Sequence, residues 1–209
     1  MMEAEMESAE QDVKVRLLLA AKKLFSRQGF DGTTIRQICE EANANVALIS
    51  YHFGGKDNIF KAIFDYSFPR AMIRQAFEEP VDPVTGMRMM IREVIHYQER
   101  DPQLVRIIQH ESVHSPARTE IIREYLFPIW EKARALLAEG RRQGVFRFRS
   151  LDSTFLYIWG GILFPRHFGL FEPVLSEPPA TKEQRIEDVT SIVLGALKCE
   201  AEAGEKVKF

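Results

Sequence analysis

Apolar residues recur every three to four positions along almost the whole chain, and this spacing constrains the fold more than any other feature. From Val13 to Phe25, for example, they fall on one face of a helix with about 3.6 residues per turn. Glycine and proline interrupt the pattern, and no stretch alternates apolar and polar residues as a half-buried strand does. The sequence therefore predicts an all-α fold, with a small N-terminal three-helix domain and a larger C-terminal helical domain.

The breaks in this pattern predict how the chain is divided. Residues 1–12 are acidic and have no apolar core, so we expect a disordered arm and not a secretory signal. Residues 13–60 form the expected N-terminal domain, and residues 61–209 form the expected C-terminal domain. In the latter, the pattern predicts helices at 83–100, 102–114, 117–142, 152–171 and 182–203.

Charge and cysteine content limit the class of protein. Because 28 Lys and Arg stand against 30 Asp and Glu, the net charge of −2 argues against DNA binding through bulk charge. Basic side chains nevertheless crowd the region from Lys14 to Lys61. No run approaches the ~20 apolar residues of a membrane span, so we expect no membrane partner. Cys39 and Cys199 fit no metal or redox pattern, which suits a cytoplasmic protein without a cofactor.

The N-terminal domain contains the signals of two short helices and a tight turn. Thr34 is followed three positions later by Gln37, and this capping box predicts a helix over residues 35–42. The next three residues, 43–45, are Asn-Ala-Asn, which is too short and polar to be anything but a turn. Asparagine tolerates the left-handed backbone that such a corner requires. A second short helix is expected at 46–53.

Two short helices joined in this way have the shape of a helix-turn-helix, whose second helix enters the major groove of DNA. The shape requires an apolar back that supports a small or polar front. Short helix pairs also occur as ordinary cores, so the shape alone leaves DNA binding and plain packing open. The expected back consists of Ile38, Ala42, Ile49 and Phe53.

The residues from Leu17 to Phe64 resemble the N-terminal region of the tetracycline-repressor (TetR) family of transcriptional regulators. The resemblance is carried by the segments LFSRQGFDGTT, IRQICEEANANVALISYHF and GGKDNIF. It implies a regulator rather than an enzyme, most commonly a repressor that binds a palindromic double-stranded DNA operator as a homodimer. It also implies that a small-molecule effector releases the DNA. The C-terminal part resembles the family only in being helical and of suitable length.

The resemblance also implies which residues contact DNA. Phosphate contacts are expected near the start of the first short helix and again at Lys56, and base readout is expected at the start of the second helix. Ser50 stands where the family usually has tyrosine, so we expect a weaker or different groove contact there. For Tyr51 and His52 the alternative is half-buried packing. The expected contact set is Thr33, Thr34, Arg36, Asn45, Val46, Ala47, Leu48, Ser50, Tyr51, His52 and Lys56.

The front of the second helix predicts a preference for A·T base pairs. Asn45 is able to pair with adenine through two hydrogen bonds, and the apolar residues 46–48 are able to contact thymine methyl groups. No Arg, Lys or Gln stands at this front, so the usual guanine contacts of Arg and Lys are absent.

The C-terminal helices offer two sets of apolar residues. The resemblance implies that the last two helices pair with those of a second copy of the chain. An internal core requires the same pattern of apolar residues. The expected dimer contacts are Phe155, Trp159, Ile162, Val189, Ile192 and Val193. A second set, for which plain core is the alternative, would line a pocket for an apolar or aromatic effector. It comprises Met90, Tyr97, Ile108, Tyr125, Trp130, Phe164, His167 and Phe168.

The segment His110-Glu111-Ser112-Val113-His114 has the HExxH pattern of zinc-dependent hydrolases. On a helix this pattern places both histidines on one face with a glutamate as general base. Pro116 is expected to stop the helix, and no third ligand follows at an evident spacing, so we expect neither catalysis nor a bound metal. His110 and His114 remain weak candidates for a metal site. An all-helical carrier of small molecules is a further alternative, which a gel shift with upstream DNA would separate from the regulator.

Overall fold

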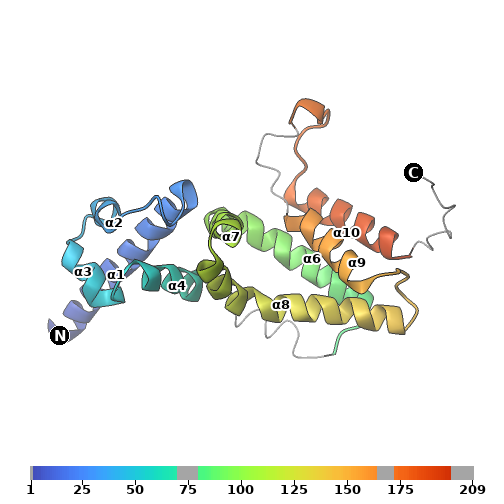
Figure 1. Ribbon diagram of the computed structural model, residues 1–209, viewed down its shortest axis with the longest axis horizontal. Coiled ribbons are helices and arrows are strands. Elements are labelled where there is room, and N and C mark those ends of the chain that lie inside the picture. Colours follow the sequence, from blue (N-terminus) through green and yellow to red (C-terminus); the bar gives the residue numbers. More distant parts are fainter. Residues whose placement is uncertain (1, 70–79, 164–171, 199–209) are drawn as a thin grey trace. The chain divides into compact units, whose positions relative to one another are not determined.

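The computed structural model describes residues 2–69, 80–163 and 172–198 of the chain (Figure 1). In these ranges the regular structure is α-helical apart from the short 3-10 turn Glu172–Val174, so the predicted all-α class is confirmed. None of these helices combines the length and the hydropathy of a membrane span. The α-helices are α1 (Met2–Gln28), α2 (Ile35–Ala42), α3 (Val46–Phe53), α4 (Lys56–Ser67), α6 (Pro83–Arg100), α7 (Pro102–His114), α8 (Pro116–Arg142), α9 (Leu151–Leu163) and α10 (Lys182–Lys198).

Most helix boundaries agree with those predicted from the sequence. Helices α2, α3, α6 and α7 begin and end at the predicted residues, and α8 and α9 begin one residue earlier than predicted. Helices α6, α7 and α8 each begin with proline. Proline suits the first turn because the N–H that it lacks would have no partner there. The predicted ends of α9 at residue 171 and of α10 at residue 203 lie outside the described residues.

Helix α1 is longer than the sequence pattern suggested. It begins at Met2, so residues 2–12 are helical in the structure, where a disordered arm was expected. The expectation rested on the lack of an apolar face in this segment. Glutamate, alanine and methionine are nevertheless strong helix formers, and acidic residues are favoured near a helix N-terminus. Local propensity therefore explains a helix that has no core-facing stripe in its first turns.

The chain folds into two compact units. The first unit consists of Met1–Ile73 and Asp101–Phe127, and the second consists of Arg74–Arg100 and Pro128–Phe209. Helix α7 and the first part of α8 thus belong with the N-terminal helices, although the segment Arg74–Arg100 of the second unit separates them in the chain. The functional boundary predicted at residue 60 lies inside α4 and remains a prediction.

The core of the first unit is built around four phenylalanines. Phe25 of α1, Phe30 of the following loop, and Phe60 and Phe64 of α4 are all buried. Neighbouring rings have centroids 5.1 to 5.7 Å apart, which is the spacing of favourable aromatic pairs. This cluster fixes the loop between α1 and α2 against α4, and it thereby positions the start of α2.

The core of the second unit lies among α6, α8, α9 and α10, which run side by side in Figure 1. Its largest members include Met87, Phe146 and Trp159. Phe146 packs so closely on Gly140 that a Cβ there would lie 2.0 Å from the ring. The segment after α8 is also tied to α10, because the Arg147 N–H donates to the Leu197 carbonyl at 2.6 Å.

Candidate nucleic-acid interface

The N-terminal end of α2 is fixed by its own side chains. The Thr34 hydroxyl accepts a hydrogen bond from the Gln37 N–H at 3.2 Å, and the Gln37 Oε1 accepts one from the Thr34 N–H at 2.8 Å. The predicted capping box is therefore confirmed. At the other end Asn43 has φ 48° and ψ 56°, so the left-handed turn residue is confirmed as well.

Asn45 caps the N-terminus of α3. Its side-chain Oδ1 accepts a hydrogen bond from the Ala47 N–H at 2.9 Å. A two-hydrogen-bond pair with adenine needs the same oxygen as acceptor. The structure thus gives Asn45 a capping role that was not predicted from the sequence, and any base contact has to share this acceptor.

The capping role leads to a stability prediction. Asn45→Ala should lower the free energy of unfolding by about 1 kcal/mol, because the Ala47 N–H loses its acceptor. Asn45→Ser should keep most of the stability, since serine caps helices about as well as asparagine. Urea denaturation followed by circular dichroism measures both variants. An alanine variant as stable as the parent chain would contradict the capping role.

The outward face of α3 is exposed. Val46 at its start retains 51% of its accessible surface and Tyr51 retains 70%, while Ile49 and Phe53 on the opposite face are buried. The predicted apolar back and uncovered front are therefore both present. Of the other predicted contacts on this helix, Ala47 and Ser50 are exposed and Leu48 and His52 are half-buried.

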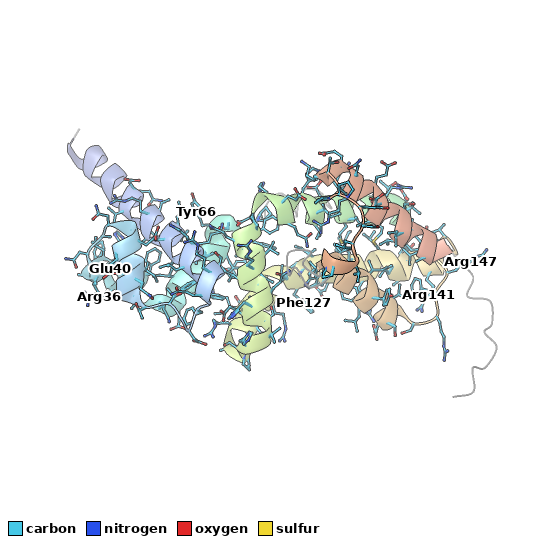
Figure 2. All side chains as sticks on the ribbon, turned by 90° about the horizontal axis from the view of Figure 1, so that it is seen from above. Arg36, Glu40, Tyr66, Phe127, Arg141 and Arg147 are labelled. Carbon is cyan, nitrogen blue, oxygen red and sulfur yellow. The ribbon has the colours of Figure 1, made fainter. Side chains whose placement is uncertain are left out.

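The predicted phosphate contacts around the start of α2 differ in accessibility. Thr33 is fully buried and its hydroxyl donates to the Gly29 carbonyl at 2.7 Å, so its side chain is not placed to contact a phosphate. The sequence showed a Thr pair without showing which member faces inward. Thr34 is exposed at the helix N-terminus. Arg36 is also exposed, and its Nε donates to Glu40 at 3.0 Å along the same helix (Figure 2).

Lys56 holds the loop that precedes α2. Its ammonium group donates to the carbonyls of Phe30 at 2.9 Å and Thr33 at 2.8 Å, and it lies 4.1 Å from the centroid of the Phe30 ring. An ammonium has three N–H donors, so a phosphate contact is compatible with this arrangement. The role predicted for Lys56 remains a prediction, and the structure adds a loop-fixing role to it.

Helix α7 contributes a buried carboxylate to the same loop. Glu111, which is only 1% exposed, accepts hydrogen bonds from the Phe30 N–H at 2.9 Å and from the Arg118 Nε at 2.5 Å. The Arg118 Nη2 donates in turn to Asp31 at 2.6 Å, and the guanidinium carbon lies 4.3 Å from the Phe30 ring centroid. We call Glu111, Arg118, Phe30 and Asp31 the loop clamp. No local pattern predicts it, because Glu111 lies 81 residues from Phe30 in the chain and Arg118 lies 87 residues from Asp31.

The surroundings of Glu111 favour its charged form. Burial raises the pKa of this carboxyl, but hydrogen bonds from the Phe30 N–H, Arg118 and His110 outweigh burial and hold the pKa below its ordinary value. Burial lowers the pKa of Arg118, whereas its bonds to Glu111 and Asp31 more than offset that effect and raise it. Glu111 and Arg118 of the loop clamp are therefore an ionised pair at neutral pH.

The geometry of Glu111 disagrees with the hydrolase alternative. A general base must present a free carboxylate oxygen to water near the metal. Both oxygens of Glu111 are bonded to protein groups, and the side chain is buried. The glutamate of the HExxH pattern thus has a structural task in this chain.

The predicted dimer contacts divide into buried and exposed residues. Trp159, Ile162 and Val193 lie in the core of the second unit, so the chain's own helices already cover them. Phe155 and Val189 are half-buried. Ile192 is 70% exposed, and Tyr157, which is not among the predicted contacts, is 88% exposed. Periodicity identified the apolar helices but did not separate the face toward their neighbours from the outward one.

The predicted pocket residues are divided between the two units, and some lie outside the described ranges. Met90 belongs to the core of the second unit, and Trp130 packs against that core. Ile108 and Tyr125 belong to the first unit, where the Tyr125 hydroxyl donates to Asp65 at 2.6 Å. Tyr97 is half-buried in α6, and Phe164, His167 and Phe168 lie outside the described residues.

A groove in the second unit lies between α6 and α10, and its volume is about 570 Å³. It is more polar than the expected pocket. Its lining consists of Arg88, Arg92, Glu183, Ile186, Glu187, Thr190, Ser191, Leu194 and Gly195. This lining of both charges differs from the apolar lining predicted for an effector pocket.

Comparison with known proteins agrees with the geometry of α2 and α3. The repressor NicS of Pseudomonas putida is 28% identical over 137 residues, which cover 63% of this chain and 64% of NicS. The chain thus matches just under two thirds of that repressor. The probable regulator YttP of Bacillus subtilis is 25% identical over 157 residues, covering 73% of this chain and 76% of YttP.

Solved structures extend the likeness to most of the chain. HlyIIR, a hemolysin II transcriptional regulator, is 28% identical and superposes with a TM-score of 0.71 over 91% of this chain and 99% of its own. AibR, crystallised with isovaleryl coenzyme A and operator DNA, shares the fold with a TM-score of 0.66 at 16% identity, over 86% of this chain and 97% of its own.

Family models match both parts of the chain. Residues 17–63 match the model described as bacterial regulatory proteins, tetR family. Residues 83–165 match the model of a tetracyclin repressor-like C-terminal domain. The chain, with its exposed helix-turn-helix and its helical C-terminal part, belongs to the tetR family of bacterial regulatory proteins.

Proposed function

We propose that the chain is a transcriptional repressor that binds a palindromic operator as a homodimer and leaves it when a small molecule binds. The observation that carries this proposal is the front of α3, where exposed side chains stand on the fixed apolar back of Ile49 and Phe53. The capped N-terminus of α2, with exposed Arg36 beside it, supports phosphate binding next to that front.

The composition of the α3 front supports A·T-rich half-sites. Val46 and Ala47 are exposed where the helix enters the groove, and small apolar side chains contact thymine methyl groups. Selection of binding sites from random duplexes tests this directly. We expect palindromic sites with A·T pairs at the positions that α3 faces. Half-sites made only of G·C pairs would contradict the proposed readout, and failure to enrich any duplex would contradict the proposed function.

Arg36 is proposed as a phosphate contact. Arg36→Ala should weaken binding to selected and unrelated duplexes alike and reduce the slope of log affinity against log salt by about one, because one fewer cation displaces counterions. Fluorescence anisotropy at several salt concentrations measures this. Arg134→Ala is the matched control, since Arg134 forms a comparable exposed ion pair with Asp152 at 2.9 Å in the second unit. A change in sequence preference without a change in the salt slope would indicate that Arg36 contacts bases and not phosphates.

The outward faces of α9 and α10 support the homodimer. Leu156, Tyr157 and Ile192 are large apolar residues that remain mostly exposed. At Gly160, Gly161 and Gly195 an added Cβ would meet no atom within 4 Å, so this surface is open for close approach by other helices. Burying large apolar side chains is favourable, and a two-fold partner presents the same face. A dimer also places two recognition helices on half-sites about 34–36 Å apart.

The C-terminal unit is the proposed location of the effector site. Trp130 and Trp159 have ring centroids 5.3 Å apart, and the buried Trp159 Nε1 has no hydrogen-bond acceptor among the residues that the structure describes. An apolar or aromatic effector that carries an acceptor oxygen would complement this site. Mass spectrometry of small molecules that co-purify with the chain tests the idea. Operator affinity that is unchanged when such a molecule is added at saturation would contradict release by that effector.

A further inference from the structure

The two histidines of α7 lie one helical turn apart on an exposed face. The rings of His110 and His114 have centroids 4.3 Å apart and planes inclined by only 14°, so they are stacked. The His110 side chain retains 49% of its accessible surface, and His114 is also exposed. Neither residue takes part in the DNA contacts or the apolar faces described above.

Each ring uses its Nδ1 atom for a local hydrogen bond. The His110 Nδ1 lies 3.0 Å from Glu111 Oε1, and the His114 Nδ1 lies 2.7 Å from the His110 carbonyl oxygen. An ionised carboxylate and a backbone carbonyl only accept hydrogen bonds, so both Nδ1 atoms must carry the proton. In the neutral imidazole this leaves the lone pair on Nε2 in both residues.

This arrangement matches the surroundings of histidines that bind metals. Such histidines donate their other N–H to a carboxylate or a backbone carbonyl, which fixes the tautomer and makes the ligating nitrogen more basic. We propose that His110 and His114 together bind one divalent transition-metal ion through their Nε2 atoms, with water in the remaining positions. The stacked rings have to turn toward each other for both lone pairs to meet one ion. Most of this turn falls to the exposed His114, because His110 is bonded to Glu111 and packs on Gly29.

The ligand set determines which ions the site accepts. Imidazole nitrogen suits Cu²⁺, Ni²⁺ and Zn²⁺, with Cu²⁺ bound most tightly, whereas Mg²⁺ and Ca²⁺ require oxygen ligands. Within the described part of the chain no group of three His, Cys, Asp or Glu residues is placed to hold a metal. The site is therefore open, with two protein ligands, and differs from the closed sites that structural zinc ions occupy.

The site adjoins the loop clamp of the N-terminal unit. The His110 Cε1 atom lies 2.6 Å from the position that a Cβ on Gly29 would take, so the ring packs on the end of α1. His110 also shares the Glu111 carboxylate with the Phe30 N–H. An ion held by α7 is thus bound next to the loop that leads into α2, and its binding should raise the melting temperature of the chain.

Isothermal titration of the tag-free, full-length chain with Cu²⁺ and with Zn²⁺ tests the proposal. A Cys199→Ser background removes one of the two thiols of the chain, and the other, Cys39, is buried. We expect one ion per chain, with affinity reduced about tenfold or more in His114→Gln and no binding in His110→Gln/His114→Gln. His96→Gln is the matched control, because His96 is a half-buried histidine of α6 and should leave the titration unchanged.

Electron paramagnetic resonance of the Cu²⁺ complex gives a second readout that does not depend on stability. The parent chain should show two coordinated imidazole nitrogens, and His114→Gln should show one. Binding that is unaffected in the double variant, or that is lost in His96→Gln, would overturn the proposal. Competition by an equal concentration of Mg²⁺ would also overturn it, because a site of two imidazoles has no preference for that ion.

Discussion

A chain carrying Ile192→Asp should elute as a monomer and should bind the selected operator roughly a thousandfold more weakly than the parent, close to its affinity for unrelated DNA. Ile192 is 70% exposed on α10, so the substitution should leave the fold of the chain itself intact. In the proposed dimer the same position is buried against a second copy, and an unpaired carboxylate there is strongly unfavourable. Sedimentation velocity and fluorescence anisotropy measure the two effects.

The expected loss is large because one α3 helix reaches too few bases. An operator with two half-sites is read by both recognition helices at once, and a monomer forfeits the second set of contacts. Val145→Asp is the matched control, since Val145 is another exposed apolar residue of the second unit, 41% exposed. An Ile192→Asp chain that stays dimeric would place the interface elsewhere. A monomer that binds the operator as tightly as the parent would remove the need for a dimer.

Sequence patterns predicted the helix-turn-helix almost residue by residue because its limits are set locally. The capping box at Thr34, the left-handed Asn43 and the glycine after α3 each act within a few positions of the helix end that they fix. Such signals depend on backbone geometry and on neighbouring side chains. The structure therefore agrees with the predicted spans of α2 and α3 to the residue.

The roles of individual side chains depended on contacts that local patterns do not contain. Thr33 and Thr34 are adjacent in sequence, yet one is buried and the other exposed, because Phe30 and Lys56 fix the loop around them. Asn45 looks like a base reader, but the first N–H groups of α3 need its oxygen. The family resemblance supplied a role for each position, whereas the hydrogen bonds of this chain decide which atoms remain for DNA.

Local sequence was also insufficient to assign the role of Glu111. The HExxH pattern suggested a general base, whereas the hydrogen-bond partners of Glu111 give it a structural role. Glu111→Gln should lower the free energy of unfolding by about 3 kcal/mol, because the mostly buried Arg118 loses its charge partner. Asp31 is largely exposed and only partly compensates. Urea denaturation at neutral pH measures the loss. Glu139→Gln is the control, since it removes a carboxylate from an exposed pair with Arg142 and should change little.

A double variant separates the buried charge from simple loss of packing. In Glu111→Gln/Arg118→Met the side-chain oxygen of the glutamine is still placed to accept the hydrogen bond from the Phe30 N–H. The guanidinium that would lack a charge partner is no longer present. Replacing a buried ion pair by neutral groups of similar volume is often close to neutral in stability. The double variant should therefore be more stable than Glu111→Gln alone. If it is less stable, the cost of Glu111→Gln does not come from an unpaired Arg118.

The pH dependence of this difference follows from the direction of the Glu111 shift. Burial raises the pKa, but the hydrogen bonds from the Phe30 N–H, Arg118 and His110 outweigh it, so the folded pKa lies below the ordinary value of 4.5. A lowered carboxyl pKa stabilises the folded state above that ordinary value, and the contribution is lost as the pH falls through the folded pKa. The parent should therefore lose its advantage over Glu111→Gln in acid, where a protonated glutamate resembles glutamine. A stability difference that stays constant from neutral pH to pH ~3 would show that the charge of Glu111 is not what holds the loop before α2.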